Sequence, residues 1–452
     1  MRPVLVLLGK ECRELAASRA WWVMLLAMGP LVGVSFISAV QTYAEASGLN
    51  GTAVGVGEAF SPLIGVWAPT FSACELAAAF LLPFVGIRLV SGDRQSGALK
   101  IELQHPMPAF ARIGAKALIL LGGWIIASLA PMAAVGLWKS YGGSIYPPEL
   151  ATVAAGHLLN AGLTIALAAA TASITEHPST AAIVTLTVTV GTWIINFIAA
   201  VHGGFWERAA GYTPTAMVAE FQHGLVRLDV VLIAATLVLA GLGLAAIWLR
   251  LGVATAQRAW ESVDLTALAA AVIFASTFAN ASWDFSENRG NSFARADEQV
   301  LRRIRTPVRI EVHLAADDPR RSDLNQRAIS KLKRVMPSLR VDYVSATSIG
   351  LFEQTSAHYG EIIYQIGGRG AMTRATTAES ALESIYGLAG IRPPIDQDPI
   401  FRGHPLAVPP KGAATVFYGV WPAVVIVAAF FAAGWPRRSA RASHASAFRR
   451  NA

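Results

Sequence analysis

Long apolar runs, separated by short polar segments, make up most of this 452-residue chain. A helix that crosses a membrane needs about 20 mainly apolar residues. Eight runs reach that length, so the pattern predicts eight membrane-spanning helices. They cover roughly residues 21–40, 71–90, 115–138, 151–174, 180–201, 229–249, 264–282 and 415–434. Only TEHPST (175–180) separates the fourth run from the fifth, and Pro178 predicts a tight reversal there.

A second pattern begins after the seventh run. Over 308–314, apolar residues alternate with polar ones, which is the period of a β-strand. Asp323 directly precedes an apolar helical periodicity and is its predicted N-cap, and DDPRRSD before that helix predicts a loop. The pattern predicts strands over 308–314, 339–344 and 361–366, and helices over 294–304, 324–336 and 377–390. Residues 283–414 therefore have the pattern of a soluble α/β domain that ends in a Pro-rich linker.

Composition supports this division into membrane and soluble parts. Hydrophobic residues make up 54% of the chain and charged residues 15%, whereas about a quarter of the residues in soluble domains are charged. The predicted fold class is an α-helical polytopic membrane protein with about eight transmembrane helices and an inserted extracytoplasmic α/β domain. The net charge of +8 does not indicate nucleic acid, because basic residues beside membrane spans produce the same excess. Cys12 and Cys74 are too isolated to predict a disulfide or a metal cluster.

Lys and Arg are distributed unevenly among the connecting segments. They are frequent in the N-terminal arm, after the second and sixth runs, and in the C-terminal tail. The loops 41–70 and 139–150 contain a single one, Lys139. Because short cytoplasmic segments carry the excess of Lys and Arg, both termini are predicted to be cytoplasmic and residues 283–414 to lie on the outer side. That domain is also Arg-rich, but long domains cross a membrane largely regardless of charge.

Motifs of phosphate binding and catalysis are missing from the sequence. It contains no G-x-x-x-x-G-K-[ST] phosphate loop, no H-E-x-x-H and no G-x-S-x-G, and its nine His residues have no metal-ligand spacing. Gly367, Gly368 and Gly370 lack the Lys-Ser/Thr end of a phosphate loop and predict a tight turn after a strand. We therefore expect no catalytic residue, no metal and no directly bound cofactor. The chain is expected not to be an enzyme, so the energy for any work has to come from a partner or a gradient.

The polar segment between the second and third runs is IRLVSGDRQSGALKIELQHPMPAFARIGAK (87–116). It resembles the R-x-x-G-x-L element, the Pro and the span-opening Lys of the type 2 ABC exporter permease family. KECRELAASRAWW near the N-terminus resembles the amphipathic elbow of that family, and the likeness extends over roughly residues 5–250. A basic loop that only sets orientation is the alternative interpretation. The matching residues are Arg94, Gly97, Leu99, Pro106 or Pro108, and Lys116.

That resemblance implies a six-span permease domain that pairs with a second permease, as a homodimer or heterodimer, and docks on a separate ATP-binding subunit. The partner would bind ATP-Mg, and segments 9–19 and 92–105 would receive its closing motion. An Arg94–Glu102 surface ion pair would contribute only about 0–1 kcal/mol and would set register more than affinity. The docking candidates are Lys10, Glu11, Arg13, Glu14, Arg94, Gly97, Leu99, Lys100 and Glu102.

Polar residues within the apolar runs are costly in a membrane, so they indicate function or helix contacts. In the fourth and fifth runs they recur every three or four residues and share one face of each predicted helix. Glu75 is predicted near the outer end of the second span. Hydrogen bonding between helices, and of Thr to its own helix, is the alternative. The candidates for a translocation path are Glu75, His157, Asn160, Thr164, Thr189, Thr192 and Asn196.

Two glycines in the first run, Gly29 and Gly33, form a small-xxx-small pair. Such pairs allow two helix backbones to approach closely. We therefore expect them to serve helix packing rather than binding or transport.

The start of the α/β domain, WDFSENRGNSFARADEQVLRRIRTPVRIEVHL, resembles the GldG-like auxiliary domain of some bacterial ABC systems. Ala294 and Arg295 replace the usual Leu-Ser, and the domain is shorter than in many relatives. The resemblance implies recognition of a periplasmic partner or substrate, without catalytic residues. The residues that fit are Asp284, Phe285, Ser286, Glu287, Asn288, Arg289, Pro307 and Val308, whereas the basic Lys331, Lys333 and Arg334 predict a solvated helix face rather than an anion site.

Together these patterns predict a permease subunit of an ABC transport system in the bacterial inner membrane. The alternative is a non-transporting mechanotransmitter that uses ATP hydrolysis to regulate or assemble an envelope complex. An intramembrane enzyme is disfavoured because no catalytic pair has suitable spacing. The predicted divisions are a permease domain (1–250), a linker with the seventh span (251–282), the periplasmic GldG-like domain with its linker (283–414), the eighth span (415–434) and a basic cytoplasmic tail (435–452).

Overall fold

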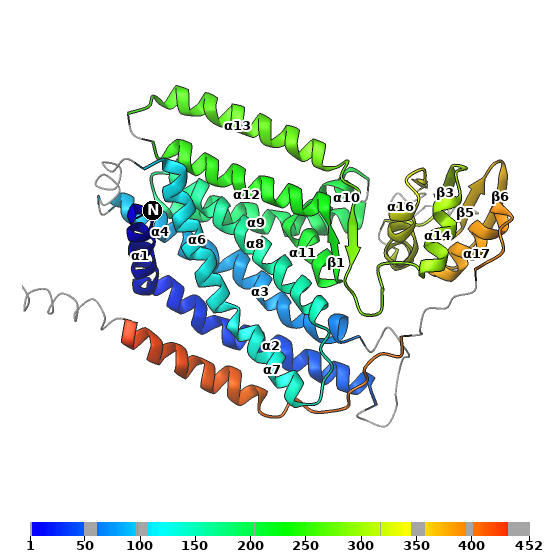
Figure 1. Cartoon of the computed structure of the whole chain (residues 1–452), viewed down its shortest axis with the longest axis horizontal. Helices are drawn as coiled ribbons and strands as arrows, with labels where there is room; N and C mark the ends of the chain where they lie inside the picture. The colour runs from blue at the N-terminus through cyan, green and yellow to red at the C-terminus, as the bar shows by residue number, and fades with distance from the viewer. Residues whose placement is uncertain are drawn as a thin grey trace, which may run out of the picture.

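The computed structural model describes residues 2–48, 61–95, 97, 107–202, 204–250, 252–316, 318–344, 358–394 and 401–432. Within them, eight helices are long and apolar enough to cross a membrane, which indicates a multi-pass membrane protein. Each of these helices overlaps one of the eight predicted runs. The helices form a bundle, and a small α/β domain lies at one end of it (Figure 1).

The bundle begins with a helix that precedes the first span and ends with a helix that follows the α/β domain. In chain order its elements are α1 (Arg2–Ala17), α2 (Arg19–Ala46), the π-helical η2 (Leu63–Trp67), α3 (Ala68–Phe80), α4 (Leu82–Gln95), α6 (Ala109–Ala127), α7 (Leu129–Ser140), α8 (Pro147–Ile174), α9 (Pro178–His202), α10 (Phe205–Ala210), α11 (Pro214–Gln222), the short strand β1 (Leu225–Arg227), α12 (Leu228–Trp248), α13 (Thr255–Ser276) and the last span Thr415–Ala432, which starts with η4 (Thr415–Val420).

The second and third spans each consist of two helices joined at a break. The breaks lie at Leu81, between α3 and α4, and at Ser128, between α6 and α7. A proline follows each break, at Pro83 and Pro131. Proline lacks the N–H that would continue the helical hydrogen bonds, so both spans bend where the proline requires it.

The predicted bounds of the seventh span, 264–282, are wrong. Helix α13 covers Thr255–Ser276, so it begins with charged residues that hydropathy alone excludes from a span. These charges have local partners, because Glu261 forms an ion pair with Arg250 and Arg258 donates to the backbone oxygen of Arg250 at 2.6 Å. Paired in this way, they extend the helix to the end of the bundle.

Helix α8 lies at the centre of the bundle and contacts α3, α4, α6, α9, α11 and α12. Its C-terminal half is rich in buried alanine, including Ala166, Ala168 and Ala169. Small side chains allow neighbouring backbones to come close. A Cβ added at Gly241 of α12 would lie 3.0 Å from the Ala166 side chain, so this contact requires glycine or a shift of one helix.

Helix α1 is separate from the first span, as the resemblance to an elbow implies. Ser18 has extended backbone and interrupts the helix before α2 begins at Arg19. One face of α1 packs on α6 and buries Leu15. Leu5 and Val6 remain exposed, at 66% and 70% of their surface, so α1 also presents an apolar face outward.

The last span packs on the first, and the predicted packing role of Gly29 and Gly33 is confirmed. A Cβ on Gly29 would clash with Trp421, and a Cβ on Gly33 would clash with Phe417. The indole of Trp421 also donates to the backbone oxygen of Leu25 at 2.8 Å. The lack of a side chain at the two glycines therefore leaves room for the aromatic side chains of the last span.

The linker before the last span lies against the ends of other spans. The Tyr43 hydroxyl donates to the backbone oxygen of His404 at 2.8 Å, and the Leu406 amide donates to the Ser47 hydroxyl at 3.0 Å. The described residues 401–412 contain no helix or strand, in agreement with the predicted extended linker. These contacts hold the linker on the bundle rather than leaving it as a free tether.

The α/β domain contains one four-stranded sheet with the order β4-β3-β5-β6. Strand β3 is parallel to β4 and antiparallel to β5, and β5 is antiparallel to β6. Ile310, Leu332 and Tyr364 lie in the core between sheet and helices. The elements are α14 (Arg295–Arg303), β3 (Val308–Val312), α15 (Pro319–Leu324), η3 (Asn325–Ile329), α16 (Ser330–Val335), β4 (Arg340–Tyr343), β5 (Ile362–Ile366), β6 (Arg369–Thr373) and α17 (Ala378–Ala389).

Most predictions for this domain are confirmed, but the start of its second helix is wrong. The DDPRRSD segment is not all loop, because α15 begins at Pro319, a residue favoured in the first turn of a helix. Asp318 is the N-cap and accepts a hydrogen bond from the Arg320 amide at 2.9 Å, so Asp323 lies within the helix instead. The tight turn is confirmed, since Gly367 and Gly368 have φ of 55° and 82°, and it leads into β6, a strand that was not predicted.

The two ends of the bundle differ in what they carry. Figure 1 shows the N-terminus, α1, the α12–α13 turn and the end of the last span at one end, and the α/β domain at the other. The described elements that lead into the predicted cytoplasmic segments therefore end on one side of the bundle, as the predicted topology requires. Which side of a membrane this end faces stays a prediction.

Candidate functional site

A buried ion cluster joins three helices at the end of the bundle opposite the α/β domain. The Lys116 ammonium of α6 lies 2.8 Å from both carboxylate oxygens of Glu11 in α1 and contacts the Asp93 carboxylate near the end of α4. Their side chains are at most 5% exposed. Lys10 adds an ion pair of 3.1 Å to Asp93 and another of 3.1 Å to Glu14. These five residues are called the elbow cluster below.

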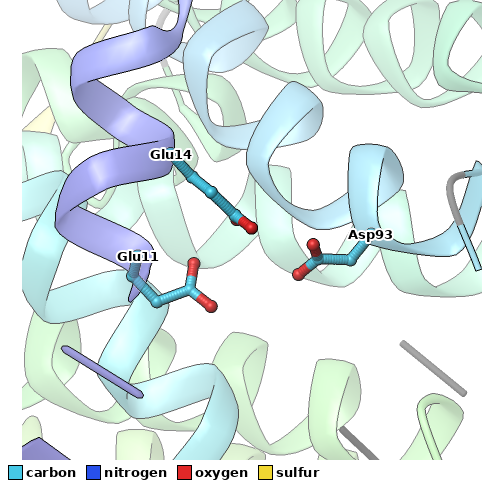
Figure 2. Close-up of side chains that lie close together, drawn as sticks. All are labelled: Glu11, Glu14 and Asp93. Carbon is cyan, nitrogen blue, oxygen red and sulfur yellow. The ribbon is translucent and has the colours of Figure 1, made fainter. Parts of the chain in front are cut away.

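Three carboxylates of the elbow cluster point into one shared space. Figure 2 shows Glu11 and Glu14 projecting from α1 toward Asp93, and one oxygen of each lies within 4.8 Å of the others. Such an arrangement would suit a metal ion, but the ammonium groups of Lys116 and Lys10 supply the positive charge here. The geometry is therefore that of an ion-pair network with an internal cation.

The electrostatic balance of the elbow cluster depends on Lys116. Burial raises the pKa of the Glu11 carboxyl, and the attraction of Lys116 opposes that rise. Removing one partner of a buried ion pair typically costs about 3–5 kcal/mol, because the remaining charge stays buried without compensation. The cluster thus makes the positions of α1, α4 and α6 depend on one another.

The docking candidates are distributed over this end in different ways. Glu11 is fully buried and faces Lys116, so it holds the chain together rather than forming an outer surface. Arg13 is exposed, and its side chain donates to the backbone oxygen of Gly9. Lys10 and Glu14 are partly exposed members of the elbow cluster, and Gly97 has a φ of 76°. The described part of the structure does not include the Arg94 side chain, Leu99, Lys100 or Glu102. Docking itself stays a prediction.

A cavity of about 470 Å³ lies between helices of the bundle and is lined by residues of α3, α8, α9, α11, α12 and α13. Its wall is mainly apolar. Five of the seven candidates for a translocation path line it, namely Glu75, Asn160, Thr164, Thr189 and Thr192. Because the second span begins at Leu63, Glu75 lies about three helical turns inside it, not near its outer end as predicted.

The other two candidates, His157 and Asn196, bind neighbouring side chains instead. The His157 imidazole lies 3.2 Å from the Gln222 amide of α11. The Asn196 amide oxygen accepts a hydrogen bond of 3.0 Å from the Thr213 hydroxyl. Both contacts join two helices, so for these residues the alternative of interhelical hydrogen bonding describes the structure.

The polar residues of the cavity differ in how well they are satisfied. Thr189 and Thr192 donate to backbone oxygens of their own helix, at 3.2 and 2.7 Å. In the described part of the chain, the side chains of Asn160 and Thr164 make no hydrogen bond, and one buried oxygen of Glu75 has no partner. The cavity therefore contains polar groups with free hydrogen-bonding capacity in apolar surroundings, which is costly unless a ligand satisfies them.

A third arrangement joins the α/β domain to the bundle at the opposite end. Strand β2 (Ser282–Asp284) pairs antiparallel with β1, and the amide of Phe285 donates to the backbone oxygen of Gly224 at 2.8 Å. The Asp284 carboxylate accepts hydrogen bonds from Ser286, Asn291 and Ser292. This turn, residues 282–292, is called the outer joint below, and it contains most of the residues that carry the GldG-like resemblance.

Two further contacts fix the outer joint and the domain behind it. The Glu149 carboxylate at the start of α8 accepts from the Glu287 amide at 2.7 Å. Arg321 of the α/β domain is buried, pairs with Glu207 of α10 and lies over the Tyr343 ring at 4.1 Å. The domain is therefore attached to the ends of several helices and not only through the chain.

The basic segment of α16 contributes to this junction, contrary to the prediction of a solvated face. Lys331 is buried with its ammonium 5.7 Å from the centre of the Phe293 ring. Arg334 donates to the backbone oxygen of Asn291, and burial lowers its pKa. Only Lys333 is exposed as expected. Helical periodicity could not indicate this, because the partners are Asn291 of the outer joint and Phe293 directly after it.

Comparisons of the chain with models of known protein families, with curated proteins and with solved structures gave no match. The fold and the three arrangements indicate a multi-pass membrane protein with an attached α/β domain and a cavity between its helices.

Proposed function

We propose that this chain is the membrane-spanning permease subunit of a bacterial ABC transport system, driven by a separate ATP-binding subunit. It lies in the inner membrane with both termini in the cytoplasm and the α/β domain in the periplasm. The partner subunit binds ATP-Mg, and two permease chains pair in the assembly. The α/β domain recognises a periplasmic partner or the substrate.

The elbow cluster is the observation that carries this proposal. It ties α1 to the end of α4 and the start of α6, next to the Arg94–Leu99 element that resembles the ATPase-facing segment of type 2 exporter permeases. A push on α1, or on the segment after α4, therefore reaches two spans through buried ionic contacts. Coupling between distant sites requires such physically connected elements.

Two further observations support a transporting permease. The cavity gathers most of the polar candidates for a translocation path inside the bundle. Helix α9 leaves large apolar side chains uncovered, including Ile183, Ile194 and Phe197, which are 54–73% exposed. A face of this kind suits lipid or the pairing of two permease chains.

A second candidate function, a non-transporting mechanotransmitter, is favoured by the outer joint. A domain attached to helix ends by a β-pair and buried polar contacts would turn when the spans move. ATP hydrolysis in the cytoplasm would then act on an envelope partner outside. This alternative shares the ATP-binding partner with the main proposal and differs from it only in whether cargo crosses the membrane.

The first experiment tests the partnership. The chain is co-expressed with the ATP-binding subunit encoded beside it and purified by a tag on that subunit. We expect the two to co-purify, and we expect scrambling of residues 94–105, which leaves Asp93 of the elbow cluster in place, to abolish the complex. A scramble of 49–60, in the opposite loop, is the matched control and leaves the complex intact. Survival of the complex after the 94–105 scramble would falsify the docking assignment.

The second experiment separates the two candidate functions. The complex is reconstituted in vesicles, and ATP-dependent movement of labelled amphipathic compounds is measured beside ATP hydrolysis. Movement that stops with hydrolysis supports the permease. Hydrolysis without movement, together with ATP-dependent changes in protease cleavage of the α/β domain, supports the mechanotransmitter.

A further inference from the structure

We infer that the cavity binds a hydrophobic organic cation, meaning a molecule with one positive charge on a largely apolar body. The inference rests on the proposed function only for the role of this ligand as cargo. Binding itself follows from the lining of the cavity and can be measured on the chain alone. It names a substrate class that neither the sequence pattern nor the resemblance indicates.

Glu75 supplies the charge selectivity. One of its carboxylate oxygens is buried and has no hydrogen-bond partner among the described residues, while the Thr215 hydroxyl lies beside the carboxyl group. Among the described residues, the lining contains no Lys, Arg or His that could act as an internal counter-charge. An ionised carboxylate in apolar surroundings is stabilised by a paired cation, so a cationic ligand gains most from this position. An anion would meet repulsion instead.

The buried carboxylates of the elbow cluster have their counter-charge within the chain. Glu11 and Asp93 of that cluster are almost completely buried and are neutralised by Lys116, whereas Glu75 is partly buried. Glu75 lines the cavity, and no Lys, Arg or His among the described lining residues pairs with it. A structural carboxylate would be expected to have a charged partner within the chain, whereas Thr215 offers Glu75 only a neutral hydroxyl.

Trp193 adds a second feature that suits a cation. Its indole lines the cavity and packs edge-to-face against Phe80, with ring centres 5.6 Å apart. Aromatic faces attract cations, and the attraction is strongest where water is excluded. A carboxyl group and an indole that line the same cavity are the usual elements for recognition of ammonium-type groups.

The rest of the lining defines the body of the ligand. Leu237, Leu244 and Ile273 come from α12 and α13 and make this side apolar. A volume of about 470 Å³ suits one small molecule. The side chains of Asn160 and Thr164 can form one or two hydrogen bonds that orient the ligand. An extended peptide would bury many more polar groups than the cavity can satisfy. The ligand is therefore compact and mostly hydrocarbon.

The position of the cavity gives such a ligand a path from the bilayer. Helices α9 and α13 both line the cavity. In the most apolar 18-residue stretch of each helix, only 11% is buried within the protein. These helices therefore lie at the periphery of the bundle, beside lipid in an inserted chain. Hydrophobic cations partition into membranes, so they would be concentrated where the cavity lies.

The test uses two probes of the same shape and opposite charge. Tetraphenylphosphonium and tetraphenylborate are titrated separately into the full-length chain in neutral detergent, without the ATP-binding subunit, and binding is measured by equilibrium dialysis. We expect saturable binding of the phosphonium and no saturable binding of the borate. Equal binding of both probes would show that apolar area alone determines binding and would overturn the inference.

Variants connect the binding to named residues. Glu75→Gln keeps the size of the side chain and should weaken phosphonium binding about tenfold or more, which corresponds to about 1.4 kcal/mol. The matched control is Glu45→Gln, which removes an exposed carboxyl group of α2 and leaves binding unchanged. If Glu75→Gln misfolds on gel filtration, Trp193→Leu with the exposed Trp206→Leu as control gives a second comparison. Unchanged affinity in a folded Glu75→Gln or Trp193→Leu variant contradicts the cation site.

The outcome can be distinguished from that of the proposed function. Phosphonium binding that depends on Glu75, in a chain that forms no complex with an ATP-binding subunit, would refute the permease and retain the cation site. A stable complex whose chain does not bind phosphonium would retain the partnership and refute the ligand class. ATP-dependent phosphonium movement in vesicles, lost in Glu75→Gln, would support both.

Discussion

The ammonium group of Lys116 lies 2.8 Å from both carboxylate oxygens of Glu11, a residue 105 positions earlier in the chain. The same ammonium contacts Asp93 at the end of the second span. One buried cation therefore joins the N-terminal helix, the exit of the second span and the start of the third. This relationship explains why a charged residue occurs inside an otherwise apolar run. Asp93 and Lys116, on either side of the segment that connects these spans, therefore belong to one network.

Replacing this cation should destabilise the chain strongly. In Lys116→Met, Glu11 loses its nearest counter-charge while staying buried, and we expect a loss of about 3 kcal/mol in the free energy of unfolding. Thermal unfolding in detergent measures the change. Lys139→Met removes an exposed lysine at the opposite end of the third span and should leave the melting temperature unchanged. Equal melting of both variants would show that the elbow cluster contributes little.

The loss in Lys116→Met should depend on pH in a defined direction. Burial already raises the pKa of Glu11 above its usual value, and the methionine removes the attraction that opposes the rise. A carboxyl group whose pKa is higher in the folded state binds more protons when folded, so acid favours folding. The deficit of the variant should therefore be largest at pH 8 and shrink as pH falls through the raised pKa of Glu11. Melting curves from pH 8 to pH 5 test this, and a deficit that grows toward pH 5 contradicts it.

The contact between the first and last spans should be sensitive to single methyl groups. A Cβ at Gly29 would overlap the Trp421 indole, so Gly29→Ala forces the last span outward at a cost of about 1–3 kcal/mol. Gly122→Ala is the control, because a Cβ there meets nothing within 4 Å. Thermal unfolding of the two variants provides the comparison. If Gly29→Ala and Gly122→Ala have the same melting temperature, the last span does not pack against Gly29.

The sequence predicts local features of this chain well. Eight apolar runs correspond to eight spans because length and hydropathy are properties of one segment. Gly29 and Gly33 indicate packing for the same reason, since four-residue spacing places them on one helix face. The error at the seventh span arises from Arg258 and Glu261, because charged residues lower the hydropathy of the segment. In the structure both residues have a partner after the end of α12.

Relations between distant segments could not be predicted in the same way. Nothing in the residues around Glu11 indicates that Lys116 is its partner, because the pairing depends on how α1 folds back on α6. The strands β1 and β2 are three residues long, too short for an alternating pattern. The polar faces of the fourth and fifth spans indicated the cavity wall, but only the packing of α3 against α8 and α9 brings Glu75 to it.

The outer joint should depend on one carboxylate. Asp284 accepts hydrogen bonds from Ser286, Asn291 and Ser292, so it holds the turn that connects the seventh span to the α/β domain. Asp284→Ala leaves several of these donors unpaired, at about 1–3 kcal/mol for each one that stays buried, and the turn should open locally before the domain unfolds. Hydrogen exchange measured by mass spectrometry should show faster exchange over residues 282–292, with the sheet of the α/β domain unchanged.

A matched control separates this effect from a general loss of charge. Asp342→Ala removes an exposed carboxylate of β4 that pairs with Arg309 on the surface, and exchange over 282–292 should stay as in the wild type. If Asp284→Ala leaves exchange in the joint unchanged, the pairing of β1 with β2 is sufficient to hold the domain. If exchange rises throughout the sheet as well, Asp284 stabilises the whole domain and is not a local joint. Faster exchange confined to the joint would show that the connection can loosen while both parts stay folded, which motion passed from the spans to the domain requires.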